Sequence, residues 1–328
     1  MTVLMRFEGL VKHYPGSQGG GAIRAVDGVT LEVHQGECLA IVGESGSGKS
    51  TLGRCALALA RPSAGTVYFE GQDLFRLRPQ QMRHKRRELQ MVFQDPVGSL
   101  SPRRTVGQIL VEPLEIHETV AASAREDRAA ELLDLVGLPS SAMSSYPHEL
   151  SGGQRQRVAI ARALATEPRF LVADEPVSAL DVSLRGQILN LLEDLRVRFE
   201  LTILLIAHDL ALVEQLADRV VVMYAGRIVE QSSTESMYRQ PQHPYTVCLL
   251  GATPGSPATI SGTAPVPLGE PPDPSALPVG CKFHPRCPIA IDRCRVEEPG
   301  LVESHPGHEV ACFLPGDLIN ESSYHGGG

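Results

Sequence analysis

Short apolar runs alternate with amphipathic stretches from residue 37 to about residue 230. Three of these runs span four to seven residues with almost no polar side chain, at 38–42, 170–173 and 201–207. Runs of this length and composition are typical of buried strands. Because helical patterns follow the runs, the sequence predicts an α/β core around a largely parallel sheet.

Two helices are marked by their residue spacing or by their ends. Apolar side chains three and four residues apart predict one buried helix face, formed by Leu184, Ile188, Leu191, Leu195 and Phe199. A second helix is expected to begin at Ser123, because Glu126 follows three residues later as in a capping box. Gly137 is expected to end this helix.

Glycine and proline interrupt the pattern twice. The run GSQGGG at 16–21 is typical of a flexible loop. Residues 251–280 contain eight prolines and five glycines, too many for a helix or a central strand. We interpret this stretch as a linker to a cysteine-containing extension.

Composition narrows the classes of function. The hydrophobic content of 42% and the charged content of 21% are typical of a globular protein. The net charge of −8 argues against non-specific binding to nucleic acids. The basic run at 83–87 is interpreted as a solvated helix face. No membrane span is expected, and the N-terminal residues lack the apolar core of a signal peptide. A cytosolic location is therefore predicted, where disulfides are disfavoured.

Residues 43–51, GESGSGKST, match the phosphate-binding pattern G-x-x-x-x-G-K-[ST] between a predicted strand and a predicted helix. Glycines let backbone N–H groups surround phosphate oxygens, and the helix directs its positive end at the same anion. Lys49 would contact the β- and γ-phosphates, and the Ser50 hydroxyl would bind Mg²⁺. We expect ATP to bind at Gly43, Ser45, Gly46, Ser47, Gly48, Lys49, Ser50 and Thr51.

Two adjacent carboxylates follow the apolar run at 170–173. Ligands bind at the carboxyl ends of strands in open α/β sheets, so these side chains are candidates for ATP hydrolysis. Asp174 is expected to hold Mg²⁺, and Glu175 to orient and deprotonate the attacking water.

The stretch LSGGQRQRVAIARAL at 150–164 resembles the signature motif of ABC-type ATPases. The resemblance implies a P-loop ABC ATPase fold with a mixed sheet core and a helical signature subdomain at about 95–165. It also implies a head-to-tail pair of ATPases, in which the signature of one contacts ATP bound to the other. The signature residues are Ser151, Gly152, Gly153 and Gln154.

Further positions resemble other elements of this family. Gln94 looks like the Q-loop glutamine that senses Mg²⁺ and the γ-phosphate, and 178–181, SALD, resembles the D-loop at the dimer interface. His208 looks like the switch histidine that contacts the γ-phosphate. Tyr14 resembles the aromatic residue that stacks on adenine, with His13 as the alternative.

A narrower resemblance covers nearly the whole chain. The segments DEPVSALDVSLRGQILNLL, HPYTVCLLGATP and CKFHPRCP are similar to ATP-binding subunits of dipeptide, oligopeptide and nickel ABC importers. This implies a cassette over 1–250 and an irregular extension over 251–328. It also implies a paralogous ATPase partner (or a second copy), two membrane permeases, a substrate-binding protein and a peripheral position on the cytoplasmic face of the cell membrane. Residues 94–117 would face the permeases.

Three other functions remain open at this point. A soluble ABC ATPase acting on DNA or ribosomes is one, although the acidic charge and the lack of a long insertion between 51 and 150 argue against it. A nickel importer and an exporter are the others.

Cys281, Cys287, Cys294 and Cys312 are separated by five, six and seventeen residues. Paired zinc ligands usually lie two to four residues apart, whereas four widely spaced cysteines suit a [4Fe–4S] cluster. The sequence favours this cluster. Zinc, with His284, His305 or His308 as a further ligand, and uncoordinated thiols remain alternatives.

Overall fold

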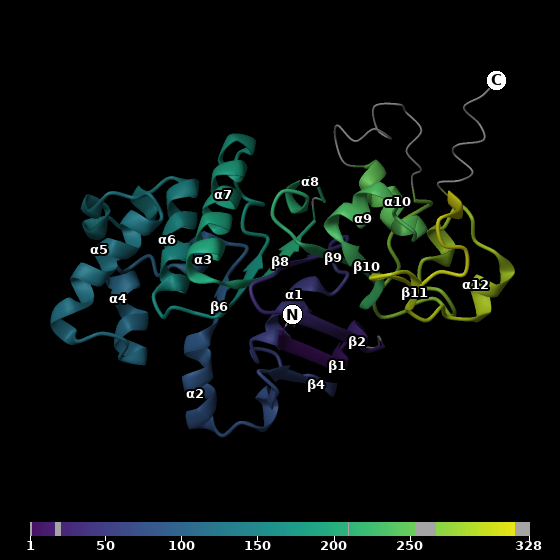
Figure 1. Cartoon of the computed structure of the whole chain (residues 1–328), viewed down its shortest axis with the longest axis horizontal. Helices are drawn as coiled ribbons and strands as arrows, with labels where there is room; N and C mark the ends of the chain where they lie inside the picture. Colours follow the sequence, from purple (N-terminus) through teal and green to yellow (C-terminus); the bar gives the residue numbers. More distant parts are fainter. Residues whose placement is uncertain (1, 17–20, 209, 253–266, 319–328) are drawn as a thin grey trace. The chain divides into compact units, whose positions relative to one another are not determined.

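The computed structural model describes residues 2–16, 21–208, 210–252 and 267–318 (Figure 1). These residues divide into two compact units. Unit 1 comprises Met1–Leu4, Val33–Glu37 and Gln72–Ile206, and unit 2 comprises Met5–Glu32, Cys38–Gly71 and Ala207–Gly328. In the parts of the chain that the structure describes, no helix is long and apolar enough to cross a membrane.

Unit 1 is built on three parallel strands. β7 pairs with β6 on one side and with β8 on the other, and Asp174 lies opposite Ile206 in the register. All residues of β7 and β8 are buried, which explains their continuous apolar sequence. The strands are β5 (Gln72–Asp73), β6 (Leu89–Val92), β7 (Phe170–Asp174) and β8 (Thr202–Ala207).

Helices α4, α5 and α6 contact one another, and α6 also contacts α7 (Figure 1). The predicted helix over 184–199 is confirmed as part of α7, and no residue of α2, which carries the basic run, is buried. The helices of unit 1 are α2 (Pro79–Glu88), α3 (Pro96–Ser99), α4 (Val106–His117), α5 (Arg125–Leu135), α6 (Gly152–Leu164) and α7 (Val182–Phe199). Four short 3₁₀ turns accompany them, at Leu74–Arg76, Ala122–Ala124, Ser140–Ser144 and Pro147–Glu149.

The predicted capping box at Ser123 is wrong. Ser123 lies inside the 3₁₀ turn Ala122–Ala124, and α5 begins at Arg125 without a side-chain cap. A capping residue needs an extended backbone, which occurs earlier, at Ala121. The end of the helix agrees with the prediction, because Gly137 adopts a φ of 68° and its N–H donates to the Asp134 carbonyl.

Unit 2 contains a pair of antiparallel strands, β1 and β4, and a second ladder in which β3 runs parallel to β9. A two-residue turn at Ala225 and Gly226, both with positive φ, connects β9 to the antiparallel β10. The strands are β1 (Val3–Tyr14), β2 (Ile23–His34), β3 (Cys38–Val42), β4 (Ala64–Phe69), β9 (Arg219–Tyr224) and β10 (Arg227–Ser233). The helices are α1 (Lys49–Ala56), α8 (Leu210–Val213), α9 (Thr234–Arg239) and α10 (Pro244–Gly251).

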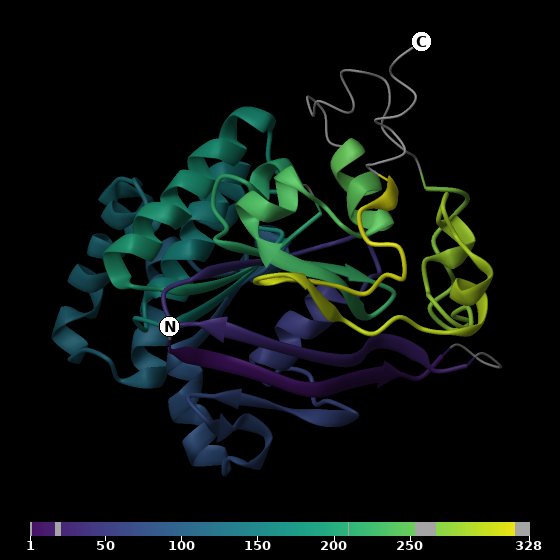
Figure 2. The ribbon, with the colours of Figure 1, turned by 45° about the vertical axis from the view of Figure 1, so that its right-hand side comes forward.

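The C-terminal extension adds two strands to this ladder. β12 pairs with β10, and β11 pairs with β12, so that the segments run side by side (Figure 2). The other regular elements of the extension are short: a 3₁₀ turn at His284–Arg286 and α12 (Asp292–Val296), with β11 at Val302–His305 and β12 at His308–Val310. Backbone hydrogen bonds also link its irregular described parts, for example from the Cys281 N–H to the Cys294 carbonyl at 2.9 Å.

A buried hydrogen-bond cluster holds β12 against β10. Glu230 on β10 is fully buried, and its carboxylate accepts from the backbone N–H groups of Gln242 and His243 at 2.7 and 2.9 Å. His308 on β12 lies 2.7 Å from the same carboxylate through Nε2, and its Nδ1 lies 2.9 Å from the Ser236 hydroxyl. A buried carboxylate is stable only when it is paired in this way.

Candidate functional site

The glycine-rich loop follows β3 directly and ends at the first turn of α1. Gly43 and Gly48 have φ values of 150° and 105°. A Cβ atom on them would lie 2.2 Å from the Met223 carbonyl oxygen and 2.0 Å from that of Ala25, so that no other residue fits. The loop therefore leaves its backbone N–H groups at the start of a helix, where an anion is stabilised.

Lys49 is folded into this loop. Its side chain is buried, and Nζ donates to the carbonyl oxygens of Gly43 and Glu44 at 2.7 and 2.8 Å. Ser47 is also buried, while Ser45 and Gly46 are exposed and Ser50 and Thr51 are half-buried. The expected phosphate-binding residues thus form one continuous turn, with the ammonium group at its centre.

Glu44, a variable position of the pattern, is held from three directions. Its N–H donates to the Tyr245 hydroxyl at 2.8 Å, and its carbonyl accepts from Lys49. Both of its carboxylate oxygens accept from Arg286, at 2.8 and 3.0 Å. These contacts could not be predicted from the sequence, because Tyr245 and Arg286 lie 201 and 242 positions away and belong to no phosphate-binding motif.

In unit 1 the predicted carboxylates lie where β7 ends. Asp174 is 3% exposed, and Glu175 follows with a φ of 45°, a left-handed conformation that is uncommon outside glycine. The Glu175 N–H donates to the Ile206 carbonyl at 2.9 Å, which fixes this turn. Gln94 Nε2 donates to a Glu175 carboxylate oxygen at 2.8 Å, so the structure brings the two predicted residues together.

The signature residues form the start of α6. Ser151 is its N-cap, and its hydroxyl accepts from the Gln154 N–H at 3.3 Å while the Gln154 side chain accepts from the Ser151 N–H at 2.9 Å. Gly152 and Gly153 face Leu180 and Leu184, where a Cβ atom would lie 3.5 and 3.2 Å from leucine methyl groups. The exposed end of this thirteen-residue helix is a second place where an anion would be stabilised.

The remaining predicted residues lie at strand ends in unit 2. His208 is exposed and follows directly after β8. Tyr14 is the last residue of β1, with the Lys12 ammonium 4.8 Å from the centre of its ring. Nε2 of the neighbouring His13 is buried without a hydrogen-bond partner among the described atoms.

The four cysteines of the extension line one small cavity, together with residues that include His243, Phe283 and His284. Burial raises the pKa of three of these thiols: Cys281, Cys287 (to about 11) and Cys312 (to about 12). Electrostatic repulsion from neighbouring cysteines of the group raises each pKa further. Within the described ranges no three of these side chains form a ready-made site for a single metal ion. His308 is bound to Glu230 and Ser236, and neither it nor His305 lines the cavity.

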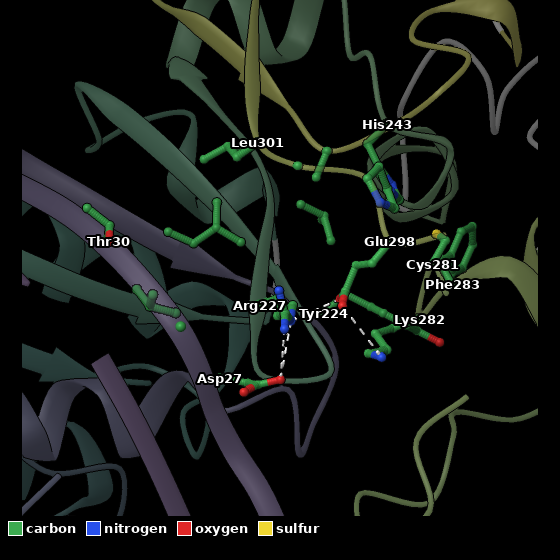
Figure 3. A pocket seen from close by; sticks show the side chains of 17 residues that line it. Asp27, Thr30, Tyr224, Arg227, His243, Cys281, Lys282, Phe283, Glu298 and Leu301 are labelled. Carbon is green, nitrogen blue, oxygen red and sulfur yellow. Dashed lines mark hydrogen bonds and ion pairs between the residues drawn. The ribbon is translucent and has the colours of Figure 1, made fainter. Parts of the chain in front are cut away.

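A second cavity, of about 280 Å³, is lined in part by Cys281 (Figure 3). Two cations, Arg227 and Lys282, line this cavity, and both form ion pairs with Glu298. Arg227 also forms an ion pair with Asp27. Residues 43–51 do not contribute to its lining. This cavity is therefore separate from the glycine-rich loop.

The chain is similar to known proteins over nearly its whole length. Residues 26–178 match the ABC transporter family, and residues 229–294 match the family described as oligopeptide/dipeptide transporter, C-terminal region. A Brucella ovis protein whose name assigns it to peptide import is 48% identical over 312 residues, 95% of this chain and 98% of that protein. The oligopeptide transport ATP-binding protein AppF of Bacillus subtilis is 46% identical over 90% of each chain.

A solved structure, the dimeric bacterial ABC transporter cassette MJ0796, superposes with a TM-score of 0.64 and 30% sequence identity. The match covers 99% of that chain and 70% of this one. The predicted α/β cassette fold is thereby confirmed, and the present chain is longer than that of MJ0796.

Proposed function

Because the chain belongs to the family of ABC transporter ATPases, specifically the ATP-binding subunits of peptide importers, we propose that it hydrolyses ATP to power the uptake of di- or oligopeptides. The observation that carries this proposal is the C-terminal match at 229–294, which includes three of the four clustered cysteines. The relatives favour peptide import over a soluble function on DNA or ribosomes.

Deletion of the gene tests the proposed solute. A bacterium without this protein is expected to lose growth on defined di- or oligopeptides as the sole source of a required amino acid, while uptake of labelled nickel stays unchanged. Growth on the free amino acid is the control. Normal peptide growth with lost nickel uptake would contradict the proposal.

In unit 2 we assign phosphate binding to the loop around Lys49. The buried ammonium group of Lys49 and the N–H groups at the start of α1 support this assignment, because both would attract phosphate oxygens. The Ser50 hydroxyl, with Gln94 and Asp174, would hold Mg²⁺, which neutralises phosphate oxygens. Hydroxyl, amide and carboxylate oxygens are suitable ligands, since Mg²⁺ takes only one or two carboxylates beside phosphate and water. Tyr14 would stack on the adenine.

In unit 1 we assign hydrolysis to Glu175. Glu175 follows β7 directly in a left-handed turn, and Gln94 donates to one of its carboxylate oxygens. A carboxylate in this position can accept the proton of the attacking water. His208 would contact the γ-phosphate.

We further propose that Ser151, Gly152, Gly153 and Gln154 bind the ATP of a partner ATPase in a head-to-tail pair. The dimeric MJ0796 cassette and the exposed N-terminus of α6 support this arrangement. Two membrane permeases, fed by a substrate-binding protein, would complete the transporter at the cytoplasmic face of the cell membrane, with 94–117 directed at the permeases.

For the cysteines we propose a [4Fe–4S] cluster. All four cysteines line one cavity. Four thiolates are the usual ligand set of such a cluster, which supports the assignment. The cluster would cross-link an extension that has few regular elements.

Metal analysis tests this assignment. Protein purified without oxygen is expected to contain about four irons and four sulfides per chain, with a broad visible absorbance. Cys287→Ser should lose iron and absorbance, whereas Cys248→Ala, a buried cysteine that does not line the cavity, should keep both. Stoichiometric zinc without iron would overturn the assignment.

A further inference from the structure

Arg286 connects the cysteine-containing extension to the phosphate-binding loop. It ends the 3₁₀ turn His284–Arg286, directly before Cys287, and it is only 6% exposed. Its guanidinium donates to both carboxylate oxygens of Glu44, in the two-pronged geometry that makes Arg–carboxylate pairs strong. It also donates to the Tyr224 hydroxyl at 3.5 Å.

The position of Arg286 is fixed by its surroundings. Its N–H donates to the Phe283 carbonyl at 2.9 Å, and its own carbonyl accepts from the Leu268 N–H at 3.0 Å. Phe283 is fully buried and packs against Tyr224 and Tyr245, with ring centres 5.2 and 5.4 Å apart. Tyr224 and Phe283 both line the cavity drawn in Figure 3. Arg286 can therefore keep its place only while this part of the extension is folded.

Without Arg286, the Glu44 carboxylate would be unfavourable for phosphate binding at the loop. Its backbone carbonyl binds Lys49, so its carboxylate is carried by the same turn that receives the phosphates. An unpaired carboxylate there would repel a triphosphate and compete for the Lys49 ammonium. Burial tends to lower the pKa of Arg286, but hydrogen bonds to Glu44 and Tyr224 outweigh it and raise the pKa, so the guanidinium stays charged.

We propose that Arg286 is a positioning residue that neutralises and immobilises Glu44, so that the folded extension sets the affinity of the loop for ATP. The inference rests on the proposed binding of ATP at 43–51. It gives the extension a role in nucleotide binding that a purely structural cross-link would not have. Any change that displaces the turn beside Cys287 would then weaken nucleotide binding at a distance from the cysteines.

The charge pair can be tested by a double-mutant cycle on the purified full-length chain, with the Kd for Mg-ATP as the readout. Arg286→Gln is expected to weaken ATP binding about tenfold, because it leaves the Glu44 carboxylate unpaired beside the phosphates. Glu44→Gln should change the Kd by less than about threefold. The double variant should resemble Glu44→Gln, because the harmful charge is gone.

Two controls separate this inference from general damage to the fold. Lys282→Gln removes another cation of the extension, which binds the Pro278 carbonyl and Glu298 and does not contact the loop, and it should leave the Kd unchanged. Thermal unfolding without nucleotide shows whether a variant is folded. A double variant as weak as Arg286→Gln, or an Arg286→Gln protein with normal affinity, would overturn the inference.

Lys49→Ala distinguishes failure of this inference from failure of the underlying assignment. If Lys49→Ala binds ATP normally, the loop is not the nucleotide site and the proposed function of these residues fails. If Lys49→Ala loses binding while Arg286→Gln does not, the loop is correct and only the role of Arg286 is refuted.

Discussion

Glu175→Gln is expected to lower ATP turnover by a factor of about 10² or more while ATP binding is retained. The amide has nearly the same shape, so the turn after β7 and a hydrogen bond with Gln94 can persist. It cannot accept the proton of the attacking water. The variant should therefore accumulate in the ATP-bound, closed state of the ATPase pair.

The measurement is ATP turnover of the complete transporter, with nucleotide content determined on the same sample. Glu193→Gln is a matched control, since Glu193 lies in α7 and pairs with Arg196 away from the end of β7. Near-normal turnover of Glu175→Gln would show that another group activates the water.

The second large effect is expected from Ser151→Asp. Aspartate is as good an N-cap as serine, and a negative charge at a helix N-terminus is favourable, so α6 should be as stable as before. The same charge would repel the γ-phosphate of ATP bound to the partner. Turnover of the assembled transporter should fall by a factor of about 10², whereas ATP binding to the isolated chain should be unchanged.

Ser151→Asn supplies the control, because asparagine caps the helix without adding charge, and its turnover should stay within about fivefold of the original. Equal losses in the aspartate and asparagine variants would point to the hydroxyl itself. Full activity of Ser151→Asp would refute binding of a partner's phosphate at this helix.

The sequence predicted the local parts of the molecule well. Strands such as 38–42 and 170–173 are confirmed because a buried strand needs apolar residues on both faces, and that requirement is visible without a structure. Lys49 and Glu175 could be assigned candidate roles because each lies in a compact motif. The Ser123 cap failed because the backbone geometry that a cap needs is not determined by residue type alone.

Long-range pairs could not be predicted in this way. Arg286 and Glu44 are separated by 242 positions. Glu44 occupies a variable position of the phosphate-binding pattern, and the segment CKFHPRCP that contains Arg286 gives no indication of its partner. The same holds for Glu230 and His308, since nothing in the neighbouring sequence identifies this glutamate as the partner of a distant histidine. Such contacts depend on the tertiary fold.

The ladder between β12 and β10 has a consequence for any shortened form of the protein. β9 occupies one side of β10, and β12 occupies the other at Glu230 and Gln231. If the chain ended near residue 250, β10 would become an open edge whose free N–H and C=O groups can pair with other molecules. Glu230 would also lose His308. Such a truncated cassette is expected to aggregate, so the extension also protects solubility.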